Sequence, residues 1–428
     1  MSRLSPGETY PVAAVAAKFE PVFTRGALFM LIALLLGETT INFIDRQVVS
    51  VLAPVLRAEF HLSNGQYAAI VNAFMATYAI ALPIAGWVLD RLGVGRGLTL
   101  AVSWWSAAGM LTALVRGPLS LGVMRSLLAM GEAGAWPAFA KATATWVPAE
   151  ARTLAIGICN SGSSLGAMIA PPLVVAVSAV AGWRGAFVVT GAIGFLWVAA
   201  FQLFRRSHPE MAIAENVHVE AADRVRWAEL LRYRQTWAVF FCRFFADPLW
   251  FFYVFWIPEF LARERGLSMA GIATVAWIPF LVADASNFIG GYLTLRLQRA
   301  GWSTNRTRKT LMVGAALLSP LGIFAVFAHS LFWTIGMISM AIFFWMFWSI
   351  TIHSLPGDYF PPRAVASVYG IGGMGSTLGS VISTWAVGRT LDVTHSYIPV
   401  FVGIGLLMPV ALAAGLSLMG RVEQVEDL

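Results

Sequence analysis

A succession of long apolar runs is the feature that most restricts the fold of this 428-residue chain. A transmembrane helix needs about 20 mainly apolar residues, and only helices or closed barrels satisfy their backbone groups in lipid. The runs are uninterrupted, whereas barrel strands alternate apolar and polar residues. The sequence therefore predicts an all-α membrane protein with twelve transmembrane helices, roughly at residues 27–55, 67–88, 98–115, 120–145, 154–179, 184–204, 236–262, 271–296, 310–329, 332–356, 364–388 and 396–419.

The charge content supports this prediction. Charged residues make up 12% of the chain, whereas about 25% of the residues of a soluble domain are charged. The net charge of +7 is by itself compatible with nucleic acid or an anionic surface. Its distribution indicates membrane topology instead, so we expect the lipid bilayer as a partner and no nucleic acid. Both cysteines, Cys159 and Cys242, lie in apolar runs, and no disulfide framework is expected.

The positive residues predict the orientation. With the N-terminus in the cytoplasm and residues near the ends of the runs counted with the adjoining segments, 20 of the 29 Lys and Arg residues fall in cytoplasmic segments, six in outer segments and three deep within the runs. This bias is typical of inner-membrane proteins, so both termini are predicted to be cytoplasmic in a bacterial inner membrane. The polar stretch 205–235 is the predicted linker. It separates an N-terminal six-helix bundle, residues 1–204, from a C-terminal six-helix bundle, residues 236–428.

The two halves also resemble one another. Gly157–Ile169 in the fifth run aligns position by position, without gaps, to Gly370–Ile382 in the eleventh. A second similarity between the halves aligns Gly86–Arg91 with Gly291–Arg296. Glycine-rich helices can look alike by chance, but an ungapped match with several identities favours a true repeat. Two parallel six-helix repeats with a substrate site at their interface are a known transporter plan.

The segment between the second and third runs reads GWVLDRLGVGR, and its gate residues are Gly86, Asp90, Arg91, Gly93 and Arg96. It resembles the signature loop of the major facilitator superfamily, which implies the fold of two pseudo-symmetric six-helix bundles. Gly86 permits close helix contact, while Asp90 and the arginines can form charge-assisted bonds that hold the cytoplasmic side shut. A loop that only followed the positive-inside rule would need the arginines but neither Asp90 nor the glycines.

Several ionisable residues lie inside the runs, where each costs at least about 2.5–3.5 kcal/mol. Asp45 and Arg46 are in the first run, and Arg125 and Glu132 lie seven residues apart on one face of the fourth. One interpretation is a structural set of two ion pairs. In the functional interpretation, Arg46 and Arg125 offer bidentate forks to a substrate carboxylate. Asp45 and Glu132 then alternate between pairing with these arginines and carrying a proton, and Glu38 has a helper role.

The Asp-Arg pair of the first run and the Arg125 and Gly-Glu-Ala step of the fourth resemble the anion:cation symporter family within that superfamily. Gly162–Leu173 and Arg243–Tyr292 are especially similar to bacterial hexuronate transporters, although Asp247 stands where some relatives have glutamate. The resemblance extends along most of the chain. It implies a symporter that imports glucuronate or galacturonate with protons, by alternating access of the two halves.

The resemblance also implies a substrate site. Arg46 and Tyr78 would hold the carboxylate, and Asn160, Ser163 and the repeat-related Ser376 would read hydroxyl groups. The candidates for the far side of the sugar lie in the second half and are Trp250, Tyr253, Trp256, Asn287 and His353. Each of these residues also has a simpler structural interpretation. A tryptophan in a membrane helix, for example, more often packs against other helices or anchors the helix at the interface.

Two further polar pairs have open roles. Arg243 and Asp247, at i and i+4, fit a self-neutralising pair as well as a site. Asp284 and Asn287, one turn apart, fit cavity lining as well as helix contact.

The sequence is also compatible with other cargoes, and two other classes of protein are considered. The same mechanism could carry another organic anion, such as galactonate or another aldonate, tartrate or an aromatic carboxylate, and the aromatic residues at 250–256 and 343–348 favour the last. A membrane sensor of such an anion is disfavoured because no signalling domain is visible. No metal-ligand cluster, nucleophile–base pair or phosphate loop indicates an enzyme. We therefore expect a monomer with no cofactor and no metal, and with the proton as coupling ion.

Overall fold

The computed structural model describes residues 24–62, 64–212, 227–267, 274–275 and 277–425. Within these ranges the regular structure is helical and contains no strand, as predicted. The elements of the first half are α2 (Arg25–Val51), α3 (Ala53–Glu59), α4 (Asn64–Leu92), α5 (Val94–Leu111), η1 (Thr112–Leu114), α6 (Pro118–Glu132), α7 (Ala135–Trp146) and α8 (Ala149–Ser207). Those of the second are α10 (Trp227–Leu230), α11 (Arg234–Arg265), α13 (Ile278–Arg299), α14 (Thr304–Leu318), η2 (Ser319–Ala325), α15 (Leu331–Tyr359), α16 (Pro362–Thr394) and α17 (Ile398–Met419).

Ten helices of the described ranges are long and apolar enough to cross a membrane. One of them, Ala151–Ser207, holds two predicted runs, because Gly182 breaks it with a φ of 67° and a ψ of 177°. The run predicted at 120–145 is divided between α6 and α7, which have 15 and 12 residues and are each too short to count. All twelve predicted runs thus contain helix, although 271–273 and 276 lie outside the described residues.

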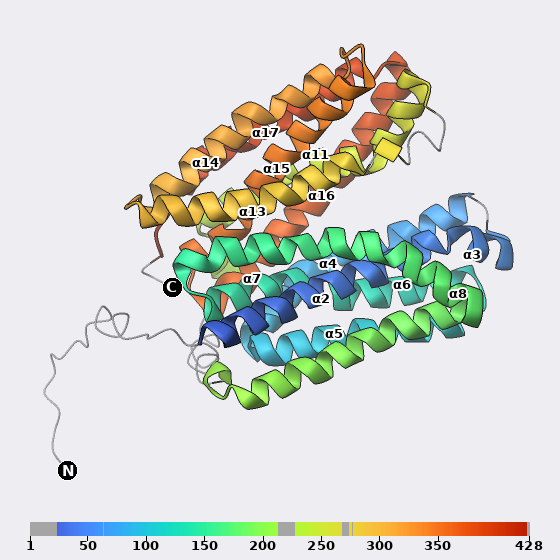
Figure 1. Ribbon diagram of the computed structural model, residues 1–428, viewed down its shortest axis with the longest axis horizontal. Helices are drawn as coiled ribbons and strands as arrows, with labels where there is room; N and C mark the ends of the chain where they lie inside the picture. The colour runs from blue at the N-terminus through green and yellow to red at the C-terminus, as the bar shows by residue number, and fades with distance from the viewer. Residues whose placement is uncertain (1–23, 63, 213–226, 268–273, 276, 426–428) are drawn as a thin grey trace, which may run out of the picture.

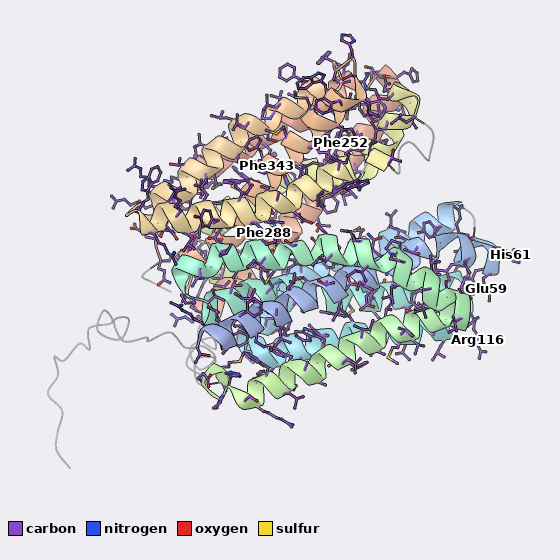
Figure 2. The ribbon with its side chains drawn as sticks, in the orientation of Figure 1. Glu59, His61, Arg116, Phe252, Phe288 and Phe343 are labelled. Atoms are coloured by element: carbon purple, nitrogen blue, oxygen red, sulfur yellow. The ribbon has the colours of Figure 1, made fainter. Side chains whose placement is uncertain are left out.

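The helices form two bundles, with α2 to α8 in one and α11 to α17 in the other (Figure 1). Of the predicted linker 205–235, residues 213–226 lie outside the described residues, as do residues 1–23 of the predicted cytoplasmic N-terminus. α8 ends and α11 begins at one end of the molecule, hereafter the linker end. Glu59, His61 and Arg116 lie at the opposite end of the first bundle (Figure 2).

Glycines of the sequence repeat make equivalent contacts inside each bundle. A Cβ added at any of four of them would lie less than 3.0 Å from a backbone carbonyl oxygen of the neighbouring helix, so only glycine allows this approach. The contacts are Gly162 with Leu36, Gly166 with Thr40, Gly375 with Phe240, and Gly379 with Phe244. In each bundle the two glycines are spaced i and i+4, and so are their two carbonyl partners. The sequence repeat is therefore a structural repeat.

The contacts between the two bundles are reciprocal. The close approaches are Gly86 to the carbonyl oxygen of Ala366, Gly291 to that of Thr153, Gly157 to that of Asn287, and Gly370 to that of Leu82. Each of these two contacts of α4 with α16 thus has a counterpart between α13 and α8, at the positions that the two sequence similarities align. The bundles pack as pseudo-symmetric partners along these two helix pairs.

At the linker end, Asp90 ties the first bundle to the second. Its carboxylate oxygens accept hydrogen bonds from the backbone N–H of Ala366 at 3.2 Å and of Ser367 at 2.7 Å. Its ion-pair partner is the buried Lys141, at 3.0 Å. The sequence also predicted charge-assisted bonds from the arginines of this loop. Arg91 lies over the ring of Trp87 at 4.2 Å, and Arg96 is exposed.

Gly93, the remaining residue of the signature loop, has a φ of 80° and caps α5. This is a left-handed conformation that glycine adopts at no steric cost. It lets the chain turn directly from α4 into α5, which keeps Asp90 at the end of α4. The glycine therefore has a geometric role beside the charged residues.

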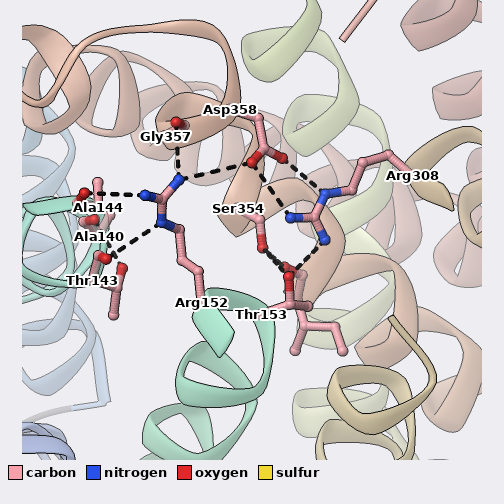
Figure 3. A network of polar contacts seen from close by, with 10 residues as sticks. Ala140, Thr143, Ala144, Arg152, Thr153, Arg308, Ser354, Gly357 and Asp358 are labelled. Atoms are coloured by element: carbon pink, nitrogen blue, oxygen red, sulfur yellow. Dashed lines mark hydrogen bonds and ion pairs between the residues drawn. The ribbon is translucent and has the colours of Figure 1, made fainter. Parts of the chain in front are cut away.

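A second polar network joins the bundles at the same end (Figure 3). Asp358 of α15 accepts from Arg308 Nε at 2.8 Å and lies 3.9 Å from Arg152 of α8. Arg308 also donates to the Thr153 hydroxyl at 2.6 Å, and Arg152 donates to the Gly357 carbonyl at 3.1 Å. Leucine occupies the second-half equivalent of Asp90, so Asp358 supplies the carboxylate here. The ribbons of the two bundles lie close at this end and diverge toward the other (Figure 1).

Candidate substrate site

A cavity of about 140 Å³ lies between the two bundles. Six long helices and the short α7 contribute to it, so neither half forms it alone. Its lining consists of Phe43, Arg46, Tyr78, Leu82, Trp136, Asn160, Ser163, Arg243, Asp247, Trp250, Phe251, Trp345, Met346, Ser349, His353, Tyr369, Gly373, Ser376 and Thr377. The repeat is visible here as well, because Ser163 and Ser376 are equivalent and both line the cavity.

Most of the predicted substrate residues meet at this cavity. Those that line it are Arg46, Tyr78, Asn160, Ser163, Trp250, His353 and Ser376. Those that do not line it are Arg125, Tyr253, Trp256 and Asn287.

Helix periodicity explains two of the exceptions. Residues at i, i+4 and i+7 share one face of a helix, and Arg243, Asp247 and Trp250 form such a stripe on α11 toward the cavity. Tyr253 and Trp256 leave this face. Tyr253 is 2% exposed and packs in the core of the second bundle, and Trp256 packs against the same core. Grouping them with Trp250 followed their nearness in sequence rather than their helical face.

Arg125 and Asn287 lie elsewhere for different reasons. Arg125 lies 4.5 Å from the centroid of the Phe74 ring, and Arg46 lies 5.3 Å from the same ring, so the arginines share an aromatic neighbour. Asn287 is fully buried where the backbone of α13 meets Gly157 of α8. The contact with Gly157 is made by its backbone carbonyl rather than by its side chain.

The electrostatic centre of the first half is an ion pair at the cavity wall. Arg46 Nε donates to Glu132 at 2.9 Å, and its guanidinium carbon lies 4.8 Å from the centroid of the Tyr78 ring. The Arg46 side chain is 22% exposed, whereas that of Glu132 is fully buried. Glu132 can therefore reach the cavity only through Arg46.

Asp45 and Glu38 lie inside the first bundle, away from the cavity lining. Asp45 faces Trp105 and Thr190, because adjacent helical residues point about 100° apart and Arg46 takes the cavity side. All four carboxylate oxygens of Asp45 and Glu38 lack a hydrogen-bond partner among the described residues. The two predicted ion pairs are thus reduced to one, Arg46–Glu132, over the part of the chain that the structure describes.

The second half contributes its own ion pair. Arg243 Nε donates to Asp247 at 3.2 Å, and both side chains line the cavity. The two interpretations of this pair, a self-neutralising pair and a part of the site, are therefore compatible, because the side chains bond to each other and also line the cavity. Asp284 accepts from the Ser164 hydroxyl of the first bundle at 2.8 Å and does not line the cavity.

Aromatic rings cover much of the remaining wall. Trp250 and Trp345 stack with centroids 4.9 Å apart, and His353 lies between Trp136 at 5.9 Å and Tyr369 at 5.3 Å. The sequence prediction did not include Trp136, Trp345 or Tyr369 as site residues. The aromatic stretch 343–348 was a signal for Trp345. Trp136 and Tyr369 had none, because only the packing of α7 and α16 brings them to the cavity.

Several buried polar atoms of the cavity residues lack hydrogen-bond partners within the described ranges. They are Asn160 Oδ1, Arg243 Nη1, Trp345 Nε1, His353 Nδ1 and Tyr369 Oη. Leaving buried polar groups unpaired is costly, and most are paired in folded proteins. A ligand rich in hydroxyl groups offers the donors and acceptors that these atoms need. No metal-ligand cluster occurs among the residues that the structure describes.

Two six-helix bundles joined by reciprocal glycine contacts, with a cavity between them that both bundles line, are the arrangement of a membrane transporter built from two parallel repeats. The sequence profile of the Major Facilitator Superfamily matches residues 35–384, and the chain belongs to this superfamily. It is a multi-pass membrane transporter with a small-molecule substrate, and it is not an enzyme.

Its relatives support this assignment. The chain is 33% identical to the hexuronate transporter of Escherichia coli (strain K12) over 393 residues, which cover 88% of this chain and 90% of the relative. It is 35% identical to the galacturonate transporter of Dickeya chrysanthemi over 289 residues, or 64% and 84% of the two chains. The solved proton:xylose symporter XylE has the same fold, with a TM-score of 0.73 at 13% identity, covering 94% of this chain and 98% of that one.

Proposed function

We propose that the protein imports a hexuronate, glucuronate or galacturonate, together with protons. The observation that carries the proposal is the position of Arg46, which lines the cavity while its Nε is bound to the buried Glu132. The named relatives that transport hexuronate and galacturonate support the same substrate class.

The cavity suits a single sugar ring. Its volume of about 140 Å³ is close to that of the engineered cavity of about 150 Å³ that binds benzene. The stacked indoles of Trp250 and Trp345 offer an apolar face to the ring. The unpaired polar atoms offer partners for its hydroxyl groups, which favours a sugar acid over an aromatic carboxylate.

Proton coupling follows from competition for Arg46. A substrate carboxylate that reaches the remaining N–H groups of the guanidinium draws it away from Glu132. Glu132 is fully buried, and an unpaired carboxylate at such a place is strongly unfavourable. It therefore takes up a proton when substrate binds and releases it when the pair re-forms. Asp45, buried and without a partner among the described residues, is the second group assigned to carry protons.

Alternating access would move the bundles about the cavity. The linker end, held by Asp90 and Asp358 in this structure, is assigned to the cytoplasm, with both termini there and the chain in the bacterial inner membrane. The transporter would work as a monomer without a cofactor.

Substrate-induced current in proteoliposomes tests the proposal. The panel is glucuronate, galacturonate, galactonate, tartrate and phthalate at two pH values, with isotope uptake as the check for electroneutral transport. A pH-dependent signal for the hexuronates alone is expected. A signal for another acid alone would replace the cargo, and binding without uptake would identify a sensor.

A further inference from the structure

The cavity wall contains two arginines, one from each bundle, and their surroundings differ. Arg46 is paired with Glu132, which lies behind it and outside the lining. Arg243 is paired with Asp247, which lies beside it in the lining itself. A ligand in the cavity therefore meets an arginine whose carboxylate lies behind it in the first half, and an arginine with its carboxylate beside it in the second.

Contacts with α16 fix the position of the Arg243 side chain. A Cβ at Gly372 would lie 3.3 Å from Arg243 Cδ, and one at Gly373 would lie 3.6 Å from Arg243 Nη1. The guanidinium carbon also lies 5.0 Å from the centroid of the Tyr369 ring. α16 thus leaves room for the guanidinium and fixes its direction. Arg243 Nη1 is buried and has no hydrogen-bond partner among the residues that the structure describes.

We propose that Asp247 restricts the cargo to molecules with one carboxylate, by neutralising Arg243 at the far side of the cavity. The inference rests on the proposed function, in which Arg46 receives the carboxylate of the substrate. A hydroxyl group beside the pair can accept from Arg243 Nη1 and donate to Asp247. A second carboxylate at the same place meets the charge of Asp247 at short range, and like charges repel strongly where water is excluded.

The cations of the cavity lining lead to the same restriction. A hexuronate brings one carboxylate, and Arg46 receives it in the proposed function. A dicarboxylate brings a second charge, and the second half of the cavity holds no cation that is free to receive it. The pair thus acts as a specificity filter, although it carries no net charge.

Glucuronate and glucarate share the six-carbon skeleton, and glucarate carries a second carboxylate at C1 in place of the aldehyde carbon that closes the glucuronate ring, so the comparison between variants, rather than the wild-type ratio alone, isolates the effect of the charge. The measurement is competition by each acid against counterflow of labelled glucuronate in proteoliposomes, for the wild type and for Asp247→Asn. We expect wild-type protein to prefer glucuronate by at least about tenfold. In Asp247→Asn, Arg243 is released, and the preference should shift toward glucarate by roughly tenfold or more, the factor that a charge-assisted hydrogen bond supplies.

The double variant Arg243→Gln/Asp247→Asn is the control. It lacks the released cation, so the gain for glucarate should disappear. A gain that persists in the double variant, or an unchanged ratio in Asp247→Asn, would show that Asp247 does not set the specificity. The wild-type ratio is a test without any variant, because equal affinity for the two acids contradicts the proposal even if Asp247→Asn fails to fold.

Failure of the proposed function gives a different result. If the wild type binds no hexuronate, the cargo assignment is wrong, and the competition is repeated with galactonate and galactarate against the acid that is transported. A shift toward galactarate in Asp247→Asn would support the filter for that cargo. A constant ratio would refute it.

Discussion

Removal of the Asp90 carboxylate tests how the linker end is held shut. In Asp90→Ala, the hydrogen bonds from the Ala366 and Ser367 N–H groups are lost, and both cross from one bundle to the other. The ion pair with Lys141 lies within the first bundle, so separation of the bundles does not require it to break. Only the two crossing bonds therefore change the equilibrium between these states.

A hydrogen bond to a charged group contributes about 1.5–3 kcal/mol. We take the lower value, because both donors lie inside α16 and keep access to helical carbonyl groups. Two bonds then give about 3 kcal/mol, or roughly a hundredfold change in the equilibrium constant. An open state populated at about 1% would become comparable in population to the closed state.

Distances between spin labels at Ser207→Cys and Ala300→Cys report on this equilibrium, since both residues are exposed at the linker end, one in each bundle. The native Cys159 and Cys242 are fully buried and are replaced by alanine for labelling. The matched control is Arg96→Ala, an exposed residue of the same loop. We expect a longer-distance population in Asp90→Ala and not in the control. Identical distributions in the two variants would refute the assignment of the lock to Asp90.

Three further predictions separate the parts of the site from the scaffold. Arg46→Ala should abolish hexuronate binding measured by tryptophan fluorescence, whereas Arg125→Ala should retain it, and the opposite order would remove Arg46 from the carboxylate site. Glu132→Gln should lose uptake driven by a pH gradient and keep counterflow exchange, so normal accumulation would contradict the coupling role. Gly379→Ala should lower thermal stability by about 1–3 kcal/mol through overpacking, because its Cβ would overlap the Phe244 carbonyl. Gly336→Ala, with open space around it, should not, and equal melting temperatures would disprove the close contact.

The sequence predicted the parts that depend on local pattern. Apolar length and glycine spacing identified the runs and the repeat, and the repeat led from Ser163 to Ser376, both of which line the cavity. Charge inside an apolar run identified Arg46 and Glu132, because the cost of burial makes such residues conspicuous. These signals are readable in the order of the chain, without knowing which helices are neighbours.

The remaining features depend on which helix faces which, and no local pattern contains this information. No local pattern pointed to Lys141, which is buried against Asp90. Tyr369 reaches the cavity because α16 crosses α4 at Gly370. Asp358 is the second carboxylate that joins the bundles at the linker end, although its position has no counterpart in the signature loop.

The repeat also explains how a symmetric scaffold orients an asymmetric cargo. The carbonyl groups that contact the repeat glycines align α2 with α11 in a single register. In this register Arg46 corresponds to Trp250, and Phe43 corresponds to Asp247, and all four line the cavity. The first bundle therefore presents a cation where the second presents an indole, and an aromatic ring where the second presents an acid. In the proposed function, a sugar acid in this cavity would have its carboxylate directed to the first bundle and its ring to the second, so the difference between the halves, rather than their similarity, would fix the binding pose.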